Sequence, residues 1–340
     1  MYTLRHIVVG YSSVFNDLLL HVRRPTAKLI DLYMLKNIQT KMRLLTLLIT
    51  LSLLGNSVYA QMPNDAIYMN KGTACLALSY NHSAWDKYWE GTTKRDNLNI
   101  GTQTTQTAMA MLAVGVTKNL NVIVGLPYIW TEASAGNLKW HKGFQDVSGW
   151  VKYRFFNQGG LSLNAVAGAS LPVTNYVPDF MPMSIGLQCK TATGRLVIRY
   201  KHKTGIYATA FGSYILRSKI KIDRDSYLMG ETLYNTNEVS VPNAYDFSGR
   251  LGYTNKYLQT EVFAEYGACT DGDNIRRNAM PFPTNNMKST SVGFYGKFQP
   301  KNLGFNVRIA RVVDGENVGQ AMTYQAGILY QFAYLKSAKK

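Results

Sequence analysis

The sequence predicts an all-β fold, a single antiparallel transmembrane β-barrel of about twelve strands within residues 72–332. Three observations lead to this prediction: segments of alternating polarity, connections that alternate between short and long, and ionic side chains on the strand face opposite the apolar one. The composition agrees with it. The 23 Tyr, the 28 Gly and a charged fraction of only 17% suit half-buried strands and tight turns better than helices.

Alternation with a period of two residues runs through most of the chain. In the segment 321–332, Tyr324, Ile328 and Phe332 share one face, and Gln325 lies on the other. One apolar and one polar face are typical of strands wetted on one side only. The predicted strands cover residues 73–82, 104–116, 121–130, 146–156, 160–173, 184–200, 205–221, 244–253, 257–268, 288–298, 303–313 and 320–332.

The connections between these strands are alternately short and long. The segments 157–159 and 254–256 are tight and polar, whereas 83–103 and 222–243 are long. An even strand count with short periplasmic turns and long extracellular loops is typical of outer-membrane barrels. The same alternation would fit a soluble β-sandwich, which is the alternative at this stage.

Two sets of side chains favour the barrel over the sandwich. Aromatic residues lie near strand ends, as in interfacial girdles, and we expect them at Tyr80, Tyr128, Trp130, Tyr153, Phe155, Tyr253, Phe298 and Phe332. The opposite face carries ions, which an enclosed polar interior tolerates and a sandwich core does not. The lumen-lining candidates are Lys152, Arg154, Arg195, Arg199, Arg250, Glu261, Glu265, Lys297 and Arg308.

Three features fit this pattern badly. Pro127 falls inside a predicted strand, although a closed barrel has no edge at which a missing N–H is harmless. The segment 206–216 is apolar on both faces. Arg311 lies on the lipid-facing phase, where a charge is tolerated only near a rim.

An export signal precedes the barrel region. Lys41 and Arg43 are followed by the apolar stretch 44–54 and by small residues before Ala60, which is the pattern of a cleavable signal peptide. We expect residues 42–60 to be this signal, with cleavage after Ala60. A buried helix or a membrane anchor is the alternative. No Cys follows the cut, so lipoprotein processing is not expected.

The flanking segments receive separate predictions. Residues 1–41 are interpreted as an over-extended reading frame, with a genuine cytoplasmic leader as the alternative. Residues 61–71 are expected to be periplasmic or to plug the barrel. Residues 333–340 form a tail beyond Phe332, which is the aromatic residue expected to end the barrel-assembly signal.

Short motifs in the first half resemble a known family. They are Gly115–Val122, Gly125–Tyr128, Gly143–Val147, Val151–Arg154 and Leu171-Pro172. The sequence is similar here to the outer-membrane barrels named for the MetA pathway of phenol degradation, which are similar in turn to long-chain fatty-acid transporters. The likeness in sequence covers residues 72–175. Beyond them, only the spacing of strands and connections is similar. It implies passage of small hydrophobic or aromatic compounds.

Catalysis and metal binding find little support. His82-Ser83 invites comparison with barrel phospholipases, but no partner residue follows at a meaningful spacing. Asp271, Asp273 and Asn274 resemble part of a calcium loop that lacks its distal Glu. We therefore expect no catalytic residues, no metal and no cofactor. The odd cysteines Cys75, Cys189 and Cys269 match no zinc or redox spacing and are expected to be packing residues.

The expected partners follow from this class. The net charge of +17 raises nucleic acid as a partner, but the Lys and Arg are scattered and no binding motif accompanies them, so none is expected. The expected partners are outer-membrane lipid, a small-molecule solute and the barrel-assembly machinery. The nine lumen candidates are mainly basic, which favours anions if a continuous water path runs through the barrel and fits hydrophobic cargo poorly. Our first hypothesis is a channel or transporter for small solutes, and the alternative is a closed structural or adhesive barrel whose loops contact partners.

Overall fold

The structure is a computed structural model that describes residues 62–137 and 140–335, all within one compact unit, Gly55–Lys340. Leader, signal peptide and most of the C-terminal tail lie outside the described residues. None of the described residues forms a helix that is long and apolar enough to cross a membrane.

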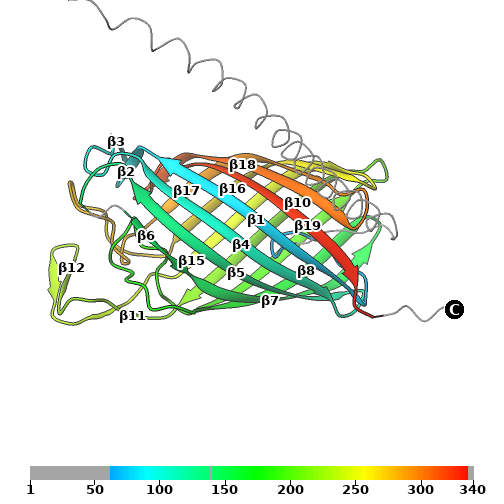
Figure 1. The fold of residues 1–340 in the computed structure, drawn as a ribbon, viewed down its shortest axis with the longest axis horizontal. Helices are drawn as coiled ribbons and strands as arrows, with labels where there is room; N and C mark the ends of the chain where they lie inside the picture. The colour runs from blue at the N-terminus through cyan, green and yellow to red at the C-terminus, as the bar shows by residue number, and fades with distance from the viewer. Residues whose placement is uncertain (1–61, 138–139, 336–340) are drawn as a thin grey trace, which may run out of the picture. The chain divides into compact units, whose positions relative to one another are not determined.

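A single antiparallel sheet closes on itself to form the barrel (Figure 1). Each strand pairs with its neighbours in the sequence, and β1 closes the ring by pairing with both β4 and β19. The twelve positions around the barrel are taken by β1 (Thr73–Trp85), β4 (Gln103–Gly115), β5 (Leu120–Ala133), β7 (Asp146–Gln158), β8 (Leu161–Pro172), β9 (Thr191–Lys201), β10 (Ile206–Arg217), β15 (Ala244–Thr254), β16 (Leu258–Cys269), β17 (Lys288–Phe298), β18 (Leu303–Glu316) and β19 (Met322–Ala333). The predicted fold class is confirmed.

The two faces of the strands differ as the alternation predicts. On β18, Phe305, Val307 and Ile309 are exposed on the outside, whereas Asn306 and Ala310 are buried toward the interior. An exposed apolar outer wall around a polar interior is the arrangement that a bilayer requires of a barrel.

The tight turns all lie at one end of the barrel and the long loops at the other (Figure 1). Five predicted strand limits are wrong by three residues or more, and two of them are the end of β5, at Ala133, and the end of β18, at Glu316. The strand predicted to begin at residue 184 begins at Thr191, because the preceding segment is a loop in which Gln188 has a φ of 56°. The strand predicted to end at residue 221 ends at Arg217, and β1 runs on to Trp85.

The long loops contain small hairpins that alternation does not reveal. One is β2 (Lys87–Glu90) with β3 (Thr93–Asp96), and another is β12 (Tyr227–Met229) with β13 (Thr232–Tyr234). The pair β11 (Ile220–Lys221) and β14 (Glu238–Val239) closes the base of the same loop. These hairpins have two to four residues a strand, too few for a period of two to stand out.

Pro127 lies where the partner of β5 changes. The first part of β5 pairs with β7, and its last part pairs with the short strand β6 (Trp140–Phe144). Between them the Gln145 N–H donates to the Pro127 carbonyl at 3.1 Å. The proline lacks an N–H at the one point where the neighbouring strand is interrupted, so the closed sheet accommodates it.

Candidate functional site

Residues 62–71, which precede β1, cross the interior of the barrel. Ala66 packs with buried side chains of β8, β9 and β10, and Met62 packs with side chains of β16, β17 and β18. Met69 packs with side chains of β1, β4, β5 and β19. At Gly115 a side chain would lie 2.2 Å from the Asn70 carbonyl, so the glycine allows this close approach. We call residues 62–71 the inner segment.

A buried ion pair ties the inner segment to the wall. The Lys152 ammonium of β7 is fully buried and donates to Asp65 Oδ1 at 2.8 Å. It also donates to the carbonyls of Met62 at 2.8 Å and Ile67 at 3.3 Å, so all three of its N–H groups have acceptors. Asp65 in turn accepts from the Met62 and Ile67 N–H groups at 2.7 and 2.9 Å, which holds the segment in a compact turn.

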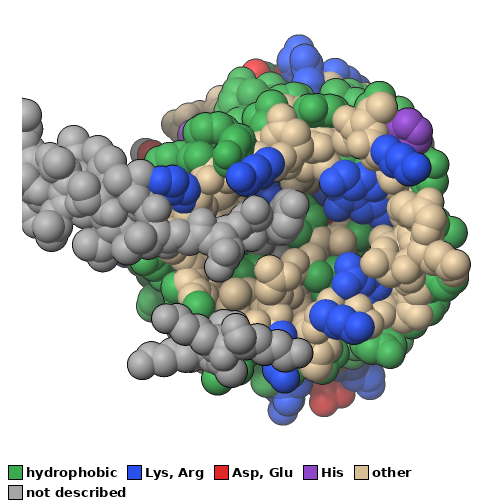
Figure 2. All heavy atoms as spheres, turned by 90° about the vertical axis from the view of Figure 1, so that its right-hand side faces the viewer, with side chains coloured by type: hydrophobic (Ala, Val, Ile, Leu, Met, Phe, Trp, Pro, Cys, Tyr) green, Lys and Arg blue, Asp and Glu red, His purple; other side chains and the backbone are tan. Residues whose placement is uncertain are grey.

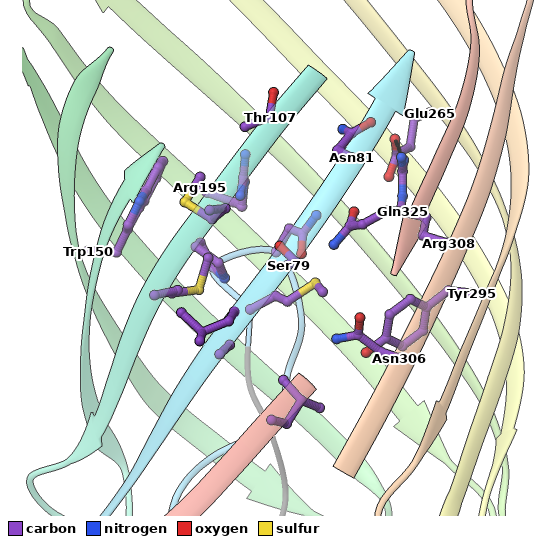
Figure 3. A pocket seen from close by; sticks show the side chains of 18 residues that line it. Ser79, Asn81, Thr107, Trp150, Arg195, Glu265, Tyr295, Asn306, Arg308 and Gln325 are labelled. Carbon is purple, nitrogen blue, oxygen red and sulfur yellow. Dashed lines mark hydrogen bonds and ion pairs between the residues drawn. The ribbon is translucent and has the colours of Figure 1, made fainter. Parts of the chain in front are cut away.

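A chamber of about 380 Å³ lies inside the barrel (Figure 3). The inner segment beside it contributes Met62, Pro63 and Asn64 to its lining. One part of its wall is apolar and is formed by Ala77, Met109, Met111, Trp150 and Leu329. The rest is polar and includes Asn81, Arg195, Glu265, Tyr295, Asn306, Arg308 and Gln325. A hollow that is partly apolar with a few polar groups is typical of small-molecule sites.

Arginines and carboxylates alternate in a network along the polar wall. Arg250 binds Glu261 at 3.1 Å and Glu265 at 3.0 Å. Glu265 also binds Arg308 at 2.6 Å. The Tyr207 hydroxyl donates to the second oxygen of Glu261 at 2.7 Å. These contacts give both carboxylates charged partners within the barrel.

Arg195 completes the compensation of charge at the chamber. Its guanidinium binds Asp246 at 3.2 Å and lies 5.6 Å from the centre of the Trp150 ring. The three arginines near the chamber thus face three carboxylates. The expectation that a basic lumen favours anions is therefore not supported at the chamber itself.

Among the nine lumen candidates, the uncompensated cations lie toward the end with the short turns. Among the described residues Arg154, Arg199 and Lys297 form no ion pair, and Arg199 instead covers the Tyr207 ring at 4.2 Å. The five short turns, 116–119, 159–160, 202–205, 255–257 and 299–302, contain no Asp or Glu. Figure 2 shows this end, where Lys and Arg side chains surround a hollow opening.

Contacts with guanidinium groups explain why the segment 206–216 is apolar on its inward face as well as on its outward face. The inward-facing Phe211 ring lies 4.6 Å from Arg195 and 5.4 Å from Arg250. Aromatic faces attract such cations. The inward-facing rings of Tyr207 and Phe211 thus provide the aromatic surfaces that the lumen arginines contact.

The loop that follows β8 reaches into the mouth at the opposite end. Gln103, which faces inward, donates to the Pro182 carbonyl at 3.3 Å, and the buried Met183 packs nearby. Tyr176 anchors the loop by donating to Asp146 at 2.6 Å, and burial together with this carboxylate raises the pKa of the Tyr176 phenol. This loop narrows the mouth from one side.

All nine lumen candidates lie on inward-facing positions of their strands. The ion-pair network joins Arg250, Glu261, Glu265 and Arg308. The sequence pattern did not single out Asp65, Asp246, Trp150 or the two methionines of the apolar wall. The alternation places Asp246 on the polar face, but only the strand register reveals its pairing with Arg195. Whether these residues line a solute path stays a prediction.

The predicted girdle residues fall into two groups. Tyr153, Phe155, Tyr253, Phe298 and Phe332 are exposed near the short-turn end of their strands. Toward the long loops, Tyr80 is exposed and its ring lies 6.0 Å from that of Trp130, which in turn contacts Tyr128. Their role at the membrane surface stays a prediction.

No catalytic arrangement is found among the described residues. His82 lies on the outward phase of β1, and no hydrogen bond joins it to a nucleophile or a carboxylate within the described ranges. No three His, Cys, Asp or Glu side chains of these ranges gather closely enough to hold a metal. The three cysteines are free and buried.

The described architecture defines a class, the outer-membrane β-barrels. No family model and no curated protein matches the sequence. The fold is similar to the crystal structure of the COG4313 outer membrane channel from Pseudomonas putida F1, with a TM-score of 0.64 and 14% identity, over 80% of this chain and 100% of that one. This likeness confirms the barrel fold that the family resemblance implied, whereas membership of that family stays a prediction.

Weaker likenesses link the chain to other barrels. The NanC porin has a TM-score of 0.45 and 7% identity, over 75% of this chain and 98% of that one. The beta domain of the Bordetella autotransporter Brka has a TM-score of 0.44 and 13% identity, over 77% of this chain and 100% of that one. At these TM-scores neither likeness bears on function.

Proposed function

We propose that this barrel is a channel through the outer membrane for small solutes that are neutral and partly apolar. The observation that carries the proposal is the chamber of about 380 Å³, which has one apolar and one charge-compensated wall. Its methionines supply flexible apolar contacts, and the amides of Asn81, Asn306 and Gln325 supply donors and acceptors. A solute with an aromatic body and a polar group matches both walls.

The compensation of charge is what points to neutral solutes. The two arginines that border the chamber, Arg195 and Arg308, are engaged by Asp246 and Glu265, so an entering anion would have to compete with carboxylates already in place. The excess of positive charge lies farther along, near the short turns. The apolar wall of the chamber and the basic short-turn end of the barrel therefore act on a solute at different depths.

Liposome swelling tests this proposal with a matched pair of solutes. Phenyl glucoside and phenyl glucuronide share an aromatic body and differ in charge, and we expect the neutral glucoside to permeate faster through the reconstituted barrel. Replacing Met111 by tryptophan fills the chamber and should reduce glucoside swelling severalfold. Leu112→Trp is the control, because the neighbouring side chain is exposed on the outer wall. Equal rates of glucoside swelling in Met111→Trp and Leu112→Trp would contradict the proposal.

One observation supports the alternative, a barrel whose loops contact partners. The hairpin β12–β13 extends from the long-loop end, and its Leu228 and Leu233 are 50% and 56% exposed (Figure 1). Stacking of Tyr227 on Tyr234 and Phe282 holds the hairpin in place. If neither the natural chain nor a chain with a displaced inner segment conducts, this alternative is favoured.

A further inference from the structure

A second hollow lies on the outside of the barrel, where the apolar wall meets the long loops. It has a volume of about 430 Å³ and is bordered by the ends of β1, β18 and β19 and by the hairpin β2–β3. Three cations border it, Lys87, Lys94 and Arg311, together with the ring of Tyr324. We call it the rim pocket, and the proposed channel makes no use of it.

Arg311 lies near the end of the membrane-facing row of β18, where only Val313, 45% exposed, precedes the exposed Asp314. The preceding outward-facing residues of β18 are Val307 and Ile309, both exposed, and Arg311 is the next side chain in that row. On the neighbouring strand Tyr324 and Met322 lie opposite Ile309 and Arg311. A cation on the lipid-facing side is costly at the bilayer midplane and tolerated near the interface. Arg311 is therefore placed at the depth of lipid headgroups.

Backbone pairing fixes the two lysines beside Arg311. The hairpin that carries them is joined to the loop between β18 and β19, because the Trp89 N–H donates to the Val318 carbonyl at 2.9 Å and the Gln320 N–H to the Lys87 carbonyl at 2.7 Å. Gly319 belongs to this contact, since a side chain there would lie 2.4 Å from the Trp85 ring. The cations thus converge on a pre-formed pocket.

The carboxylates near the rim pocket leave a positive excess. Asp86 borders the pocket, and Asp96 binds Lys87 at 3.5 Å in a pair whose side chains are both about half exposed or more. Lys94 lies over the Trp89 ring at 5.6 Å, and neither it nor Arg311 forms an ion pair among the described residues. Such a pocket suits an anion whose attached apolar part lies along the exposed wall below it.

We propose that the rim pocket binds a phosphate group of a phosphorylated glycolipid in the outer leaflet. The phosphate contacts Arg311 and Lys94, with Lys87 beside it, and the acyl chains run along Ile309 and Tyr324. Charge-assisted bonds from Arg and Lys to phosphate are the strong element of this recognition. The ring of Tyr324 borders both the polar and the apolar part of the lipid.

Binding of lipid A to the purified chain in detergent micelles tests the inference. We expect the double variant K94Q/R311Q to bind lipid A about thirtyfold more weakly, since each cation near an anionic lipid surface contributes roughly a fivefold factor. The control is K203Q/K256Q, which removes two exposed lysines at the short-turn end and should bind as the natural chain does. Heat-modifiable migration on gels verifies that each variant is folded.

Three further arms separate the sources of the phosphate. Dephosphorylated lipid A should bind to the natural chain as weakly as lipid A binds to K94Q/R311Q. Inorganic phosphate at millimolar concentration should not displace lipid A from the natural chain. Phosphatidylglycerol should bind to the natural chain less tightly than lipid A does. Equal binding of lipid A to K94Q/R311Q and the natural chain overturns the inference. Equal binding of the dephosphorylated lipid, displacement by free phosphate, or equally tight phosphatidylglycerol binding does so too. None of these outcomes depends on transport.

Discussion

Replacing Asp65 by asparagine is expected to open the barrel and to raise its single-channel conductance in planar bilayers severalfold. The change removes the anion that faces the fully buried Lys152 ammonium while leaving the wall of the barrel unchanged. A buried charge that loses its partner costs about 3–5 kcal/mol. That cost applies only while the inner segment lies inside the barrel, because water can hydrate Lys152 once the segment has left the interior. The equilibrium then shifts toward release by at least about a hundredfold.

The double variant D65N/K152M distinguishes this cause from a general loosening of the barrel. With both charges removed no ammonium is left unpaired, so the segment should stay seated and conductance should return toward that of the natural chain. Glu316→Gln is the matched control, because it breaks the 2.7 Å ion pair with Lys288 at the long-loop end. Unchanged conductance in Asp65→Asn would contradict the view that the inner segment limits the path.

The strands could be predicted because the polarity of each strand residue matches the environment on its own side of the sheet. Lipid on one side and an enclosed polar interior on the other give every second residue of β18 the same character, and this pattern needs no knowledge of the partner strands. Pro127 and Arg311 broke local rules, and both mark particular places in the structure: a break in the neighbouring strand and the rim of the apolar wall. Such exceptions are informative for that reason.

The candidate site could be predicted only in part, because its chemistry depends on contacts between distant residues. Lys152 and Arg195 were identified as inward-facing cations, but their partners Asp65 and Asp246 lie 87 and 51 residues away in the sequence. A count of cations on one face therefore overestimated the charge of the interior. The chamber also depends on the inner segment, whose residues 62–71 are too few and too irregular to show any periodicity.

Replacing Arg250 by methionine is expected to lower the free energy of unfolding of the barrel by about 3–5 kcal/mol. Arg250 is buried and binds both Glu261, which is almost fully buried, and Glu265. Its removal leaves Glu261 with the Tyr207 hydroxyl but without a cation, whereas Glu265 keeps Arg308. Tryptophan fluorescence during urea titration in micelles measures the change.

Two further variants test whether this loss comes from the uncompensated carboxylate. In R250M/E261Q the buried charge is removed together with its partner, so part of the lost stability should return, because well-packed neutral side chains often replace a buried ion pair without penalty. Lys219→Met breaks an exposed pair with Glu238 at 3.8 Å and should change the free energy of unfolding by less than about 1 kcal/mol. If Arg250→Met were no more disruptive than Lys219→Met, the lumen network would not brace the barrel. The polar wall of the chamber would then be free to rearrange around a passing solute.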